Sequence, residues 1–177
     1  MHFKKENGSF KRNNLLNGSS FYDLIYFRNI GVAFGFEVES DSGIANLRKI
    51  STTTNWIYKI KGVRGYYNEH PGKQLRKNSQ ETMLVVTTNK NKIQILSDLA
   101  DTNPKLIAVV VVPDKSFISD FQFLGDSHLV VLTSFGKLSV FSIHQNRVKP
   151  AILKAVINLA INKHNIGESF THFSTLS

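Results

Sequence analysis

One segment of the chain is repeated, without a gap, forty-five residues later. Residues 83–97, MLVVTTNKNKIQILS, align with residues 128–142, HLVVLTSFGKLSVFS. The aliphatic residues at 84–86 meet those at 129–131, and Leu96 meets Phe141. Each copy is typical of a strand, a tight turn and a returning strand. A repeat of this length and content restricts the fold to an array of small, similar antiparallel sheets.

Outside the repeat, the chain is also a series of short apolar segments separated by turn residues. Residues 32–39 alternate large apolar residues (Val32, Phe34, Phe36, Val38) with smaller or polar ones, which predicts a strand with one buried face. Further strands are expected over residues 21–27, 44–51, 56–63, 105–112 and 117–124. Adding forty-five to residues 105–112 predicts a last strand over residues 150–157; a helix over residues 151–163 is the competing interpretation.

The alternation within the two copies predicts that they share one buried core. The residues expected in it are Leu84, Val86, Ile93, Ile95, Leu129, Val131, Leu138 and Val140.

The repeat resembles a degenerate blade of a WD-repeat β-propeller. Residues 117–123, FISDFQF, correspond to the inner strand of such a blade, residues 125–127 to its turn, and residues 136–142 to its closing strand. Phe141 and Ser142 stand where the family has Trp and Asp, and its Gly-His dipeptide is missing, so the hydrogen-bonded network of a regular WD blade cannot form. The resemblance implies an all-β fold of about three blades. This is an incomplete propeller, because propellers close with 4–8 blades. An irregular antiparallel sandwich is the alternative fold.

Three regions are expected along the chain: a disordered basic arm over residues 1–20, a β-propeller-like domain over residues 21–163, and a polar C-terminal tail over residues 164–177. Three blades would leave an open sheet edge. We therefore expect the isolated chain to be poorly stable or to self-associate.

Positive charge is concentrated in two segments. Residues 2–12 carry a net charge of +3 and residues 59–77 a net charge of +5, out of +9 for the whole chain. The second segment overlaps a polar insertion predicted over residues 62–80, which also contains aromatic residues. Basic side chains neutralise phosphates and aromatic rings stack on unpaired bases. The candidate site for a nucleic acid or an acidic partner comprises Lys59, Lys61, Arg64, Tyr66, Tyr67, Lys73, Arg76 and Lys77; the competing interpretation is a solvated loop.

We find no sequence pattern for catalysis. The chain has no Cys, which excludes thiolate metal sites and cysteine nucleophiles, and its six His include no pair at metal-ligand spacing. Phosphate-binding loops and the Gly-x-Ser-x-Gly motif are also missing. His128 and His144 are expected to be exposed strand ends, and Asp120 is expected on an inner strand. The sequence therefore predicts no enzymatic activity, no cofactor, no metal and no small-molecule substrate.

The function that this sequence predicts is a non-enzymatic protein–protein interaction scaffold within an intracellular complex, cytoplasmic or nuclear. The N-terminus does not resemble a secretory signal, and no apolar run approaches the length of about 20 residues that spans a bilayer, so no membrane partner is expected. The expected partners are other proteins of a multi-subunit complex, with RNA as the second candidate. Two alternatives stay open: an RNA- or DNA-binding propeller of an RNA-processing or ribosome-assembly complex, and a truncated fragment without independent activity.

Overall fold

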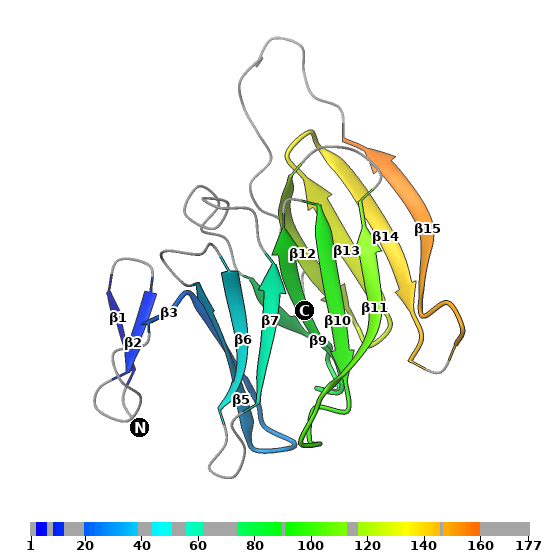
Figure 1. Cartoon of the computed structure of the whole chain (residues 1–177). Helices are drawn as coiled ribbons and strands as arrows, with labels where there is room; N and C mark the ends of the chain where they lie inside the picture. Colours follow the sequence, from blue (N-terminus) through cyan, green and yellow to red (C-terminus); the bar gives the residue numbers. More distant parts are fainter. Residues whose placement is uncertain are drawn as a thin grey trace.

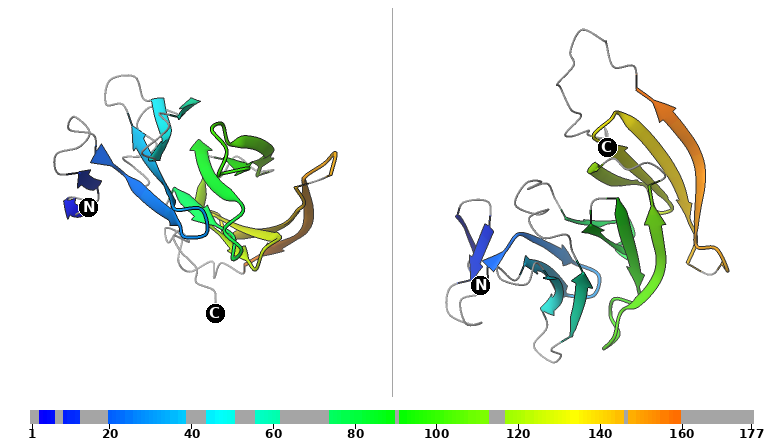
Figure 2. Two further views of the ribbon diagram at one scale, coloured as in Figure 1. Left: turned by 90° about the horizontal axis from the view of Figure 1, so that it is seen from below. Right: turned by 45° about the horizontal axis from the view of Figure 1, so that its top comes forward.

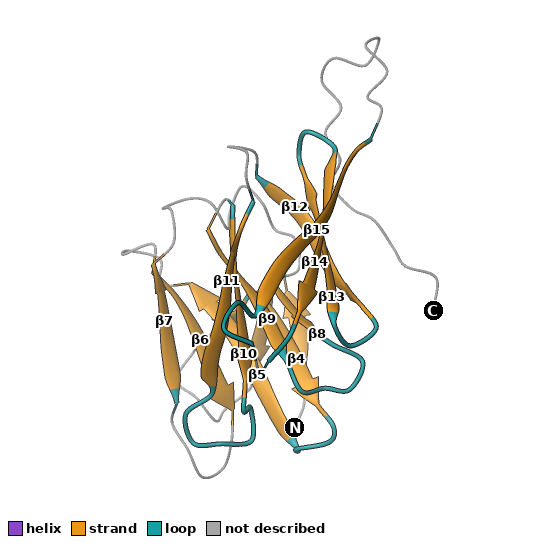
Figure 3. Cartoon of the chain, turned by 90° about the vertical axis from the view of Figure 1, so that its right-hand side faces the viewer, coloured by secondary structure: helices purple, strands orange, loops and turns teal. Residues whose placement is uncertain are grey.

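A computed structural model describes residues 3–6, 9–12, 20–38, 44–50, 56–61, 74–89, 91–112, 117–145 and 147–159 of the chain. This part of the chain contains strands and turns and no helix (Figure 3). No helix long and apolar enough to cross a membrane is therefore found among these residues. The strands form one three-stranded and three four-stranded antiparallel sheets.

We call the four-stranded sheets blade 1, blade 2 and blade 3. Blade 1 contains β4 (Asp23–Phe27), β5 (Val32–Val38), β6 (Ile44–Ile50) and β7 (Ile57–Lys61). Blade 2 contains β8 (Leu75–Lys77), β9 (Leu84–Asn89), β10 (Lys92–Ser97) and β11 (Lys105–Val111). Blade 3 contains β12 (Ile118–Leu124), β13 (His128–Thr133), β14 (Lys137–Ile143) and β15 (Ala151–Asn158).

The three blades follow one another in space as they do in the sequence, with blade 2 in the middle (Figures 1 and 2). Within each blade the four strands pair in the order in which they follow one another in the chain. The first strands lie closest together, because β8 contacts both β4 and β12. This arrangement confirms the all-β class and the expectation of about three propeller blades.

A small sheet lies beside blade 1 (Figure 1). It consists of β1 (Phe3–Glu6), β2 (Ser9–Arg12) and β3 (Ser20–Phe21). β1 and β2 pair as antiparallel strands within the stretch that the sequence predicted as a disordered arm. The residues between them are Asn7 and Gly8, a pair that strongly favours two-residue hairpin connections. The predicted region boundaries stay a prediction.

Two local expectations are settled by strand pairing. The last described segment is the strand β15, which pairs with β14 from Ala151 opposite Ile143 to Asn158 opposite Lys137, so the helical interpretation of this segment is wrong. The predicted insertion over residues 62–80 is too long, because Leu75–Lys77 form the first strand of blade 2. Residues 62–73 lie outside the described part of the chain.

The buried apolar residues form two cores, one between each pair of neighbouring blades, so the prediction of a single shared core is wrong. Leu84, Val86 and Leu96 pack toward blade 1, whereas Ile93 and Ile95 pack toward blade 3. Leu129 and Val131 belong to the second core, while Leu138 and Val140 are half-buried and belong to neither.

The reason for the two cores lies in the pairing of β9 with β10. Leu84 is opposite Leu96, and Val85 is opposite Ile95. Opposite residues share a face and successive residues alternate between faces, so Leu84 and Ile95 lie on different sides of the sheet. A blade between two others buries both of its faces, and apolar residues then occupy both sets of alternating positions.

Gly125 in the turn between β12 and β13 has a φ of 61°. A Cβ atom at this position would meet nothing within 4 Å, so only the left-handed backbone disfavours a side chain there. We expect Gly125→Ala to lower the free energy of unfolding by about 1 kcal/mol, and Gly125→Asn by less, because Asn tolerates this conformation. Urea unfolding measures both; equal losses for the two variants would contradict the backbone explanation.

Candidate functional site

The predicted basic site is divided by the structure. Lys59 is exposed on β7, whereas Arg76 and Lys77 lie on β8 and take part in contacts between blades. The other members lie outside the described residues: Arg64, Tyr66, Tyr67, Lys73 and the side chain of Lys61. Nucleic-acid or acidic-partner binding by this set stays a prediction.

Arg76 connects blade 2 to blade 3. Its Nη2 atom donates a hydrogen bond to Asp120 Oδ1 at 3.0 Å, and its guanidinium carbon lies 5.6 Å from the centroid of the Phe121 ring. The Arg76 and Asp120 side chains are only 14% and 5% exposed. The charge of Arg76 is therefore neutralised within the fold, and this side chain joins blades instead of presenting a free cation to a phosphate.

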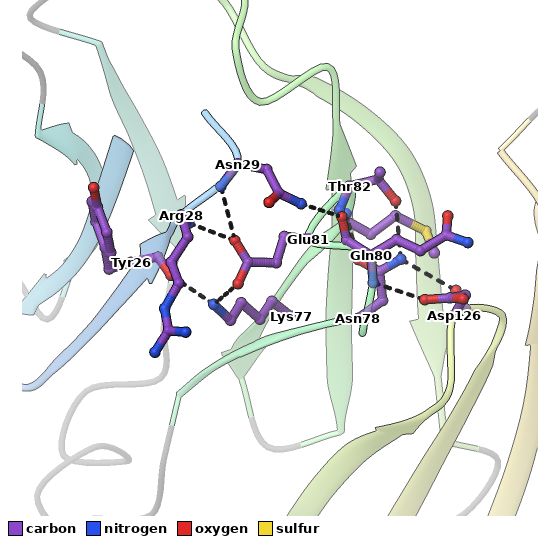
Figure 4. A network of polar contacts seen from close by, with 10 residues as sticks. Tyr26, Arg28, Asn29, Lys77, Asn78, Gln80, Glu81, Thr82 and Asp126 are labelled. Carbon is purple, nitrogen blue, oxygen red and sulfur yellow. Dashed lines mark hydrogen bonds and ion pairs between the residues drawn. The ribbon is translucent and has the colours of Figure 1, made fainter. Parts of the chain in front are cut away.

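Lys77 connects blade 2 to blade 1. Its Nζ atom donates to the Tyr26 carbonyl at 2.7 Å and to the Glu81 carboxylate, and it lies 5.6 Å from the centroid of the Phe27 ring. Glu81 also accepts hydrogen bonds from the backbone N–H groups of Arg28 and Asn29, the second at 3.3 Å. Arg28 and Asn29 lie in the turn between β4 and β5 of blade 1, and Figure 4 shows the Glu81 carboxylate between Lys77 and this turn.

The turn between β8 and β9 is bonded to a turn of each neighbouring blade. On one side, Asn29 Nδ2 donates to the Gln80 carbonyl at 3.1 Å; on the other, the Gln80 N–H donates to Asp126 Oδ1 at 2.8 Å (Figure 4). Asn78 fixes the turn itself, because its Oδ1 accepts from the N–H groups of Thr82 and Met83 at 2.9 and 2.8 Å. We call this set the polar junction: Arg28, Asn29, Lys77, Asn78, Gln80, Glu81, Thr82 and Asp126.

The polar junction was not predicted from the sequence. Asn78 is followed by Ser79, which is a recognisable turn signal, because Asn side chains bond to the backbone a few residues further on. The partners of the junction come from turns about fifty residues away on either side, and no local pattern in the sequence links them.

Glu81 has an unfavourable backbone conformation, which is stabilised by the contacts of its carboxylate with Lys77, Arg28 and Asn29. Its φ is 55°, in the left-handed region that residues other than Gly, Asn and Asp rarely occupy. The hydrogen bond from Lys77 is the main cause that lowers the pKa of the Glu81 carboxyl, and the N–H groups of Asn29 and Arg28 act in the same direction. A strained residue whose side chain makes contacts with two blades serves to fix their relative position.

The lowered pKa of Glu81 gives stability a dependence on pH. The folded state binds a proton on this carboxyl less readily than the unfolded state, so its contribution is complete above the ordinary pKa of 4.5 and is lost as the pH falls through the lowered value. In Glu81→Gln the free energy of unfolding should therefore decrease less than in the unmodified chain when the pH falls from about 6 to about 3. Urea unfolding over this range tests it. A decrease in stability for Glu81→Gln equal to that of the unmodified chain over this range would contradict the role of the carboxylate.

A second polar contact joins the inner strands of blades 1 and 2. Asp23 Oδ2 accepts from the backbone N–H groups of Gln74 and Leu75, both at 2.8 Å, and Oδ1 accepts from Leu24 at 2.9 Å. Burial raises the pKa of the Asp23 carboxyl, although these three N–H groups and Arg76 act to lower it. Asp120 makes the corresponding local bond in blade 3, where its Oδ1 accepts from the Phe121 N–H at 2.9 Å.

An open cavity of about 390 Å³ adjoins the junction, between blade 2 and the end of β14. Thr82 and Met83 line it from blade 2, and Asp126, His144 and Arg147 line it from blade 3. His128 is exposed at the start of β13, as expected, whereas His144, just after β14, is half-buried and has a ring nitrogen 2.6 Å from Ser142 Oγ. Among the described residues there is no group of three or more His, Cys, Asp or Glu side chains that could hold a metal ion.

Comparison with known proteins gives independent support for the propeller fold. No protein-family model matches the sequence, and no curated protein matches it. Among solved structures, the chain is similar to the WD40 β-propeller Hsv2 of Kluyveromyces lactis, with a TM-score of 0.56 and 15% sequence identity over 91% of this chain and 55% of Hsv2. It also matches the HIRA structure, with a TM-score of 0.42 and 16% identity over 77% of this chain and 42% of that one.

The chain therefore spans about half the length of the Hsv2 propeller. At this level of identity the likeness concerns the fold alone. It confirms the resemblance to WD-repeat blades, in a chain where Phe141 and Ser142 replace the usual Trp-Asp pair.

Proposed function

We propose that the chain is a non-enzymatic protein–protein interaction scaffold of the propeller type, and that it works within a multi-subunit complex. One observation carries this proposal: the last described strand, β15 of blade 3, has apolar side chains in contact with solvent. Leu153 and Val156 lie on one face of β15 and are 44% and 46% exposed, and Ile157 lies on the other face and is 48% exposed. Exposed apolar surface of this kind, on a rigid sheet, is typical of sites that bind another protein.

The roles of the charged side chains support the same function. Arg76 and Lys77 are the two members of the predicted basic site whose described side chains lie on blade 2, and both are paired within the fold. Their pairing lessens the support for the alternative function in nucleic-acid binding. The basic residues outside the described part keep that alternative open to experiment.

Affinity purification of the tagged full chain from its own cells tests the proposed function. We expect a protein partner in stoichiometric amount that survives nuclease treatment. Ile157→Asp should remove the partner, whereas Asn158→Asp should not, because only the first change replaces an exposed apolar side chain. Circular dichroism verifies that both variants fold. A chain recovered alone would contradict the scaffold function, and a nuclease-sensitive complex would favour nucleic-acid binding.

A further inference from the structure

The cavity of about 390 Å³ lies between blades 2 and 3, where the turn after β8, the turn after β12 and the end of β14 meet. Its lining combines apolar, polar and charged side chains and includes Thr82, Met83, Asp126, Ile143, Gln145 and Arg147. Met83 and Ile143 are 3% and 2% exposed and form the apolar part of the wall. Pockets that bind small ligands have volumes of about 300–1,000 Å³. The cavity therefore has room for a side chain of a short peptide and part of its neighbour.

The walls of this cavity are held in place by hydrogen bonds within the fold. The Gln80 N–H donates to Asp126 Oδ1 at 2.8 Å (Figure 4). The Ile143 N–H donates to the Ser127 carbonyl at 2.6 Å. Asn78, whose side chain fixes the turn after β8, is only 2% exposed. A site with walls that are ordered before binding loses little conformational entropy when a ligand enters.

Two side chains of the lining have hydrogen-bond donors available for a ligand. Thr82 Oγ1 accepts from Asn78 Nδ2 at 2.9 Å and from Gln145 Nε2 at 3.4 Å. With both of these bonds made, the hydroxyl hydrogen of Thr82 is left to donate. Arg147 is exposed and adds a guanidinium, which only donates, and no carboxylate of the described residues forms an ion pair with it. A ligand that matches these donors is an acceptor with negative charge.

Asp126 indicates which kind of anion fits. Its carboxylate also lines the cavity, and its Oδ1 already accepts the Gln80 N–H. A phosphate group carries almost twice the negative charge of a carboxylate at neutral pH, so Asp126 repels it more strongly. A guanidinium binds a carboxylate through two parallel hydrogen bonds. The lining therefore favours a carboxylate over a phosphate.

We infer that this cavity binds a carboxylate group on a short segment of a partner protein, an inference that rests on the proposed scaffold function. Arg147 and the Thr82 hydroxyl donate to the carboxylate oxygens. An aliphatic part of the same segment lies against Met83 and Ile143. The carboxylate belongs to an acidic side chain or to the C-terminus of the partner, and both sources present the same chemistry to the cavity.

Titration of the full chain with blocked dipeptides, followed by NMR of its backbone amides, tests this inference. The probe is acetyl-leucyl-glutamate amide, and the matched probe without charge is acetyl-leucyl-glutamine amide. The charged probe should shift the amide signals of Thr82, Met83 and Gln145 in a saturable manner. It should bind about tenfold more tightly than the uncharged probe, because hydrogen bonds between ionised groups are the stronger ones. Acetyl-leucyl-glutamine with a free C-terminus distinguishes a terminal carboxylate from a side-chain carboxylate.

Arg147→Gln identifies the cation of the site. This change keeps a polar side chain and removes the charge, so it should weaken binding of the charged probe about tenfold and abolish the preference over the uncharged probe. The matched control is Lys149→Gln, since Lys149 is also exposed and does not line the cavity. It should change the affinity less than about twofold, because salt screens an exposed charge outside the site. Circular dichroism verifies that both variants fold.

Several results would overturn the inference. The charged and uncharged probes could bind equally well, or binding could survive Arg147→Gln. An equal loss in Lys149→Gln would mean that general positive charge attracts the probe. Tighter binding of acetyl-leucyl-phosphoserine amide would make the ligand a phosphate. The proposed function is judged separately: a partner that the Arg147→Gln chain still retains in affinity purification would support the scaffold function and exclude this cavity as the binding site.

Discussion

Arg76→Ala is expected to lower the free energy of unfolding by about 3–5 kcal/mol. Arg76 supplies the cation for Asp120, whose side chain is only 5% exposed, across the boundary between blades 2 and 3. Its loss removes the Arg76 guanidinium from a buried carboxylate, and breaking a buried ion pair on one side costs more than the value of the ion pair itself. Urea unfolding followed by circular dichroism measures the effect.

Two further variants make this prediction specific. Lys59→Ala removes an exposed cation of the same predicted basic site and should change stability by less than about 0.5 kcal/mol. The double variant Arg76→Ala with Asp120→Ala should lose less than the sum of the two single variants, because both changes remove the same ion pair. If Arg76→Ala behaved like Lys59→Ala, Arg76 would not join the blades as described, and the candidate binding role would regain support.

Phe36→Ala is expected to have an effect of similar size. Phe36 lies on β5 in the core between blades 1 and 2 and is fully buried. Truncation of a buried Phe to Ala typically costs about 3–5 kcal/mol, because it combines lost apolar burial with a cavity. The matched control is Phe135→Ala, since Phe135 lies in the turn between β13 and β14 and is 67% exposed. Equal losses in the two variants would mean that blade 1 does not pack on blade 2 through β5.

The sequence predicted the class of fold and most strands well, because alternation and turn residues are local signals. Val32, Phe34, Phe36 and Val38 all pack toward blade 2, as their alternation indicated. Adding the length of the repeat to residues 105–112 predicted a last strand over residues 150–157, and this was correct to within one residue, because β15 covers Ala151–Asn158.

The arrangement of the core could not be predicted in the same way. In a propeller both faces of a blade are buried, so Leu84, Val85 and Val86 are all apolar although they point to different sides. Alternation then no longer distinguishes an inner face from an outer one, and only the register of the strands decides. The prediction of a single core was wrong because it placed Leu84 and Ile95 on the same face of the sheet, and only the register shows that they lie on different faces.

The candidate site was predicted less well, and the reason is also physical. Charge density along the sequence identified Arg76 and Lys77 but could not show that Asp120 and Glu81 neutralise them. Asp120 is forty-four residues from Arg76 in the sequence. Glu81 reaches Lys77 through the turn after β8, in which the backbone of Glu81 is left-handed. Basic residues near a blade boundary are therefore poor indicators of a binding surface until their partners are known.

The central claim is that three blades stack through two separate cores, and proton NMR on methyl-labelled protein tests it most directly. We predict nuclear Overhauser effects from the Ile93 and Ile95 methyl groups to Leu129, Val131 and the ring of Phe121. A separate set should connect Leu84, Val86 and Leu96 with the rings of Phe34 and Phe36. Nuclear Overhauser effects that connect Leu84 with Ile95 and Leu129 would contradict the stacked blades, because all three residues would then belong to a single shared core.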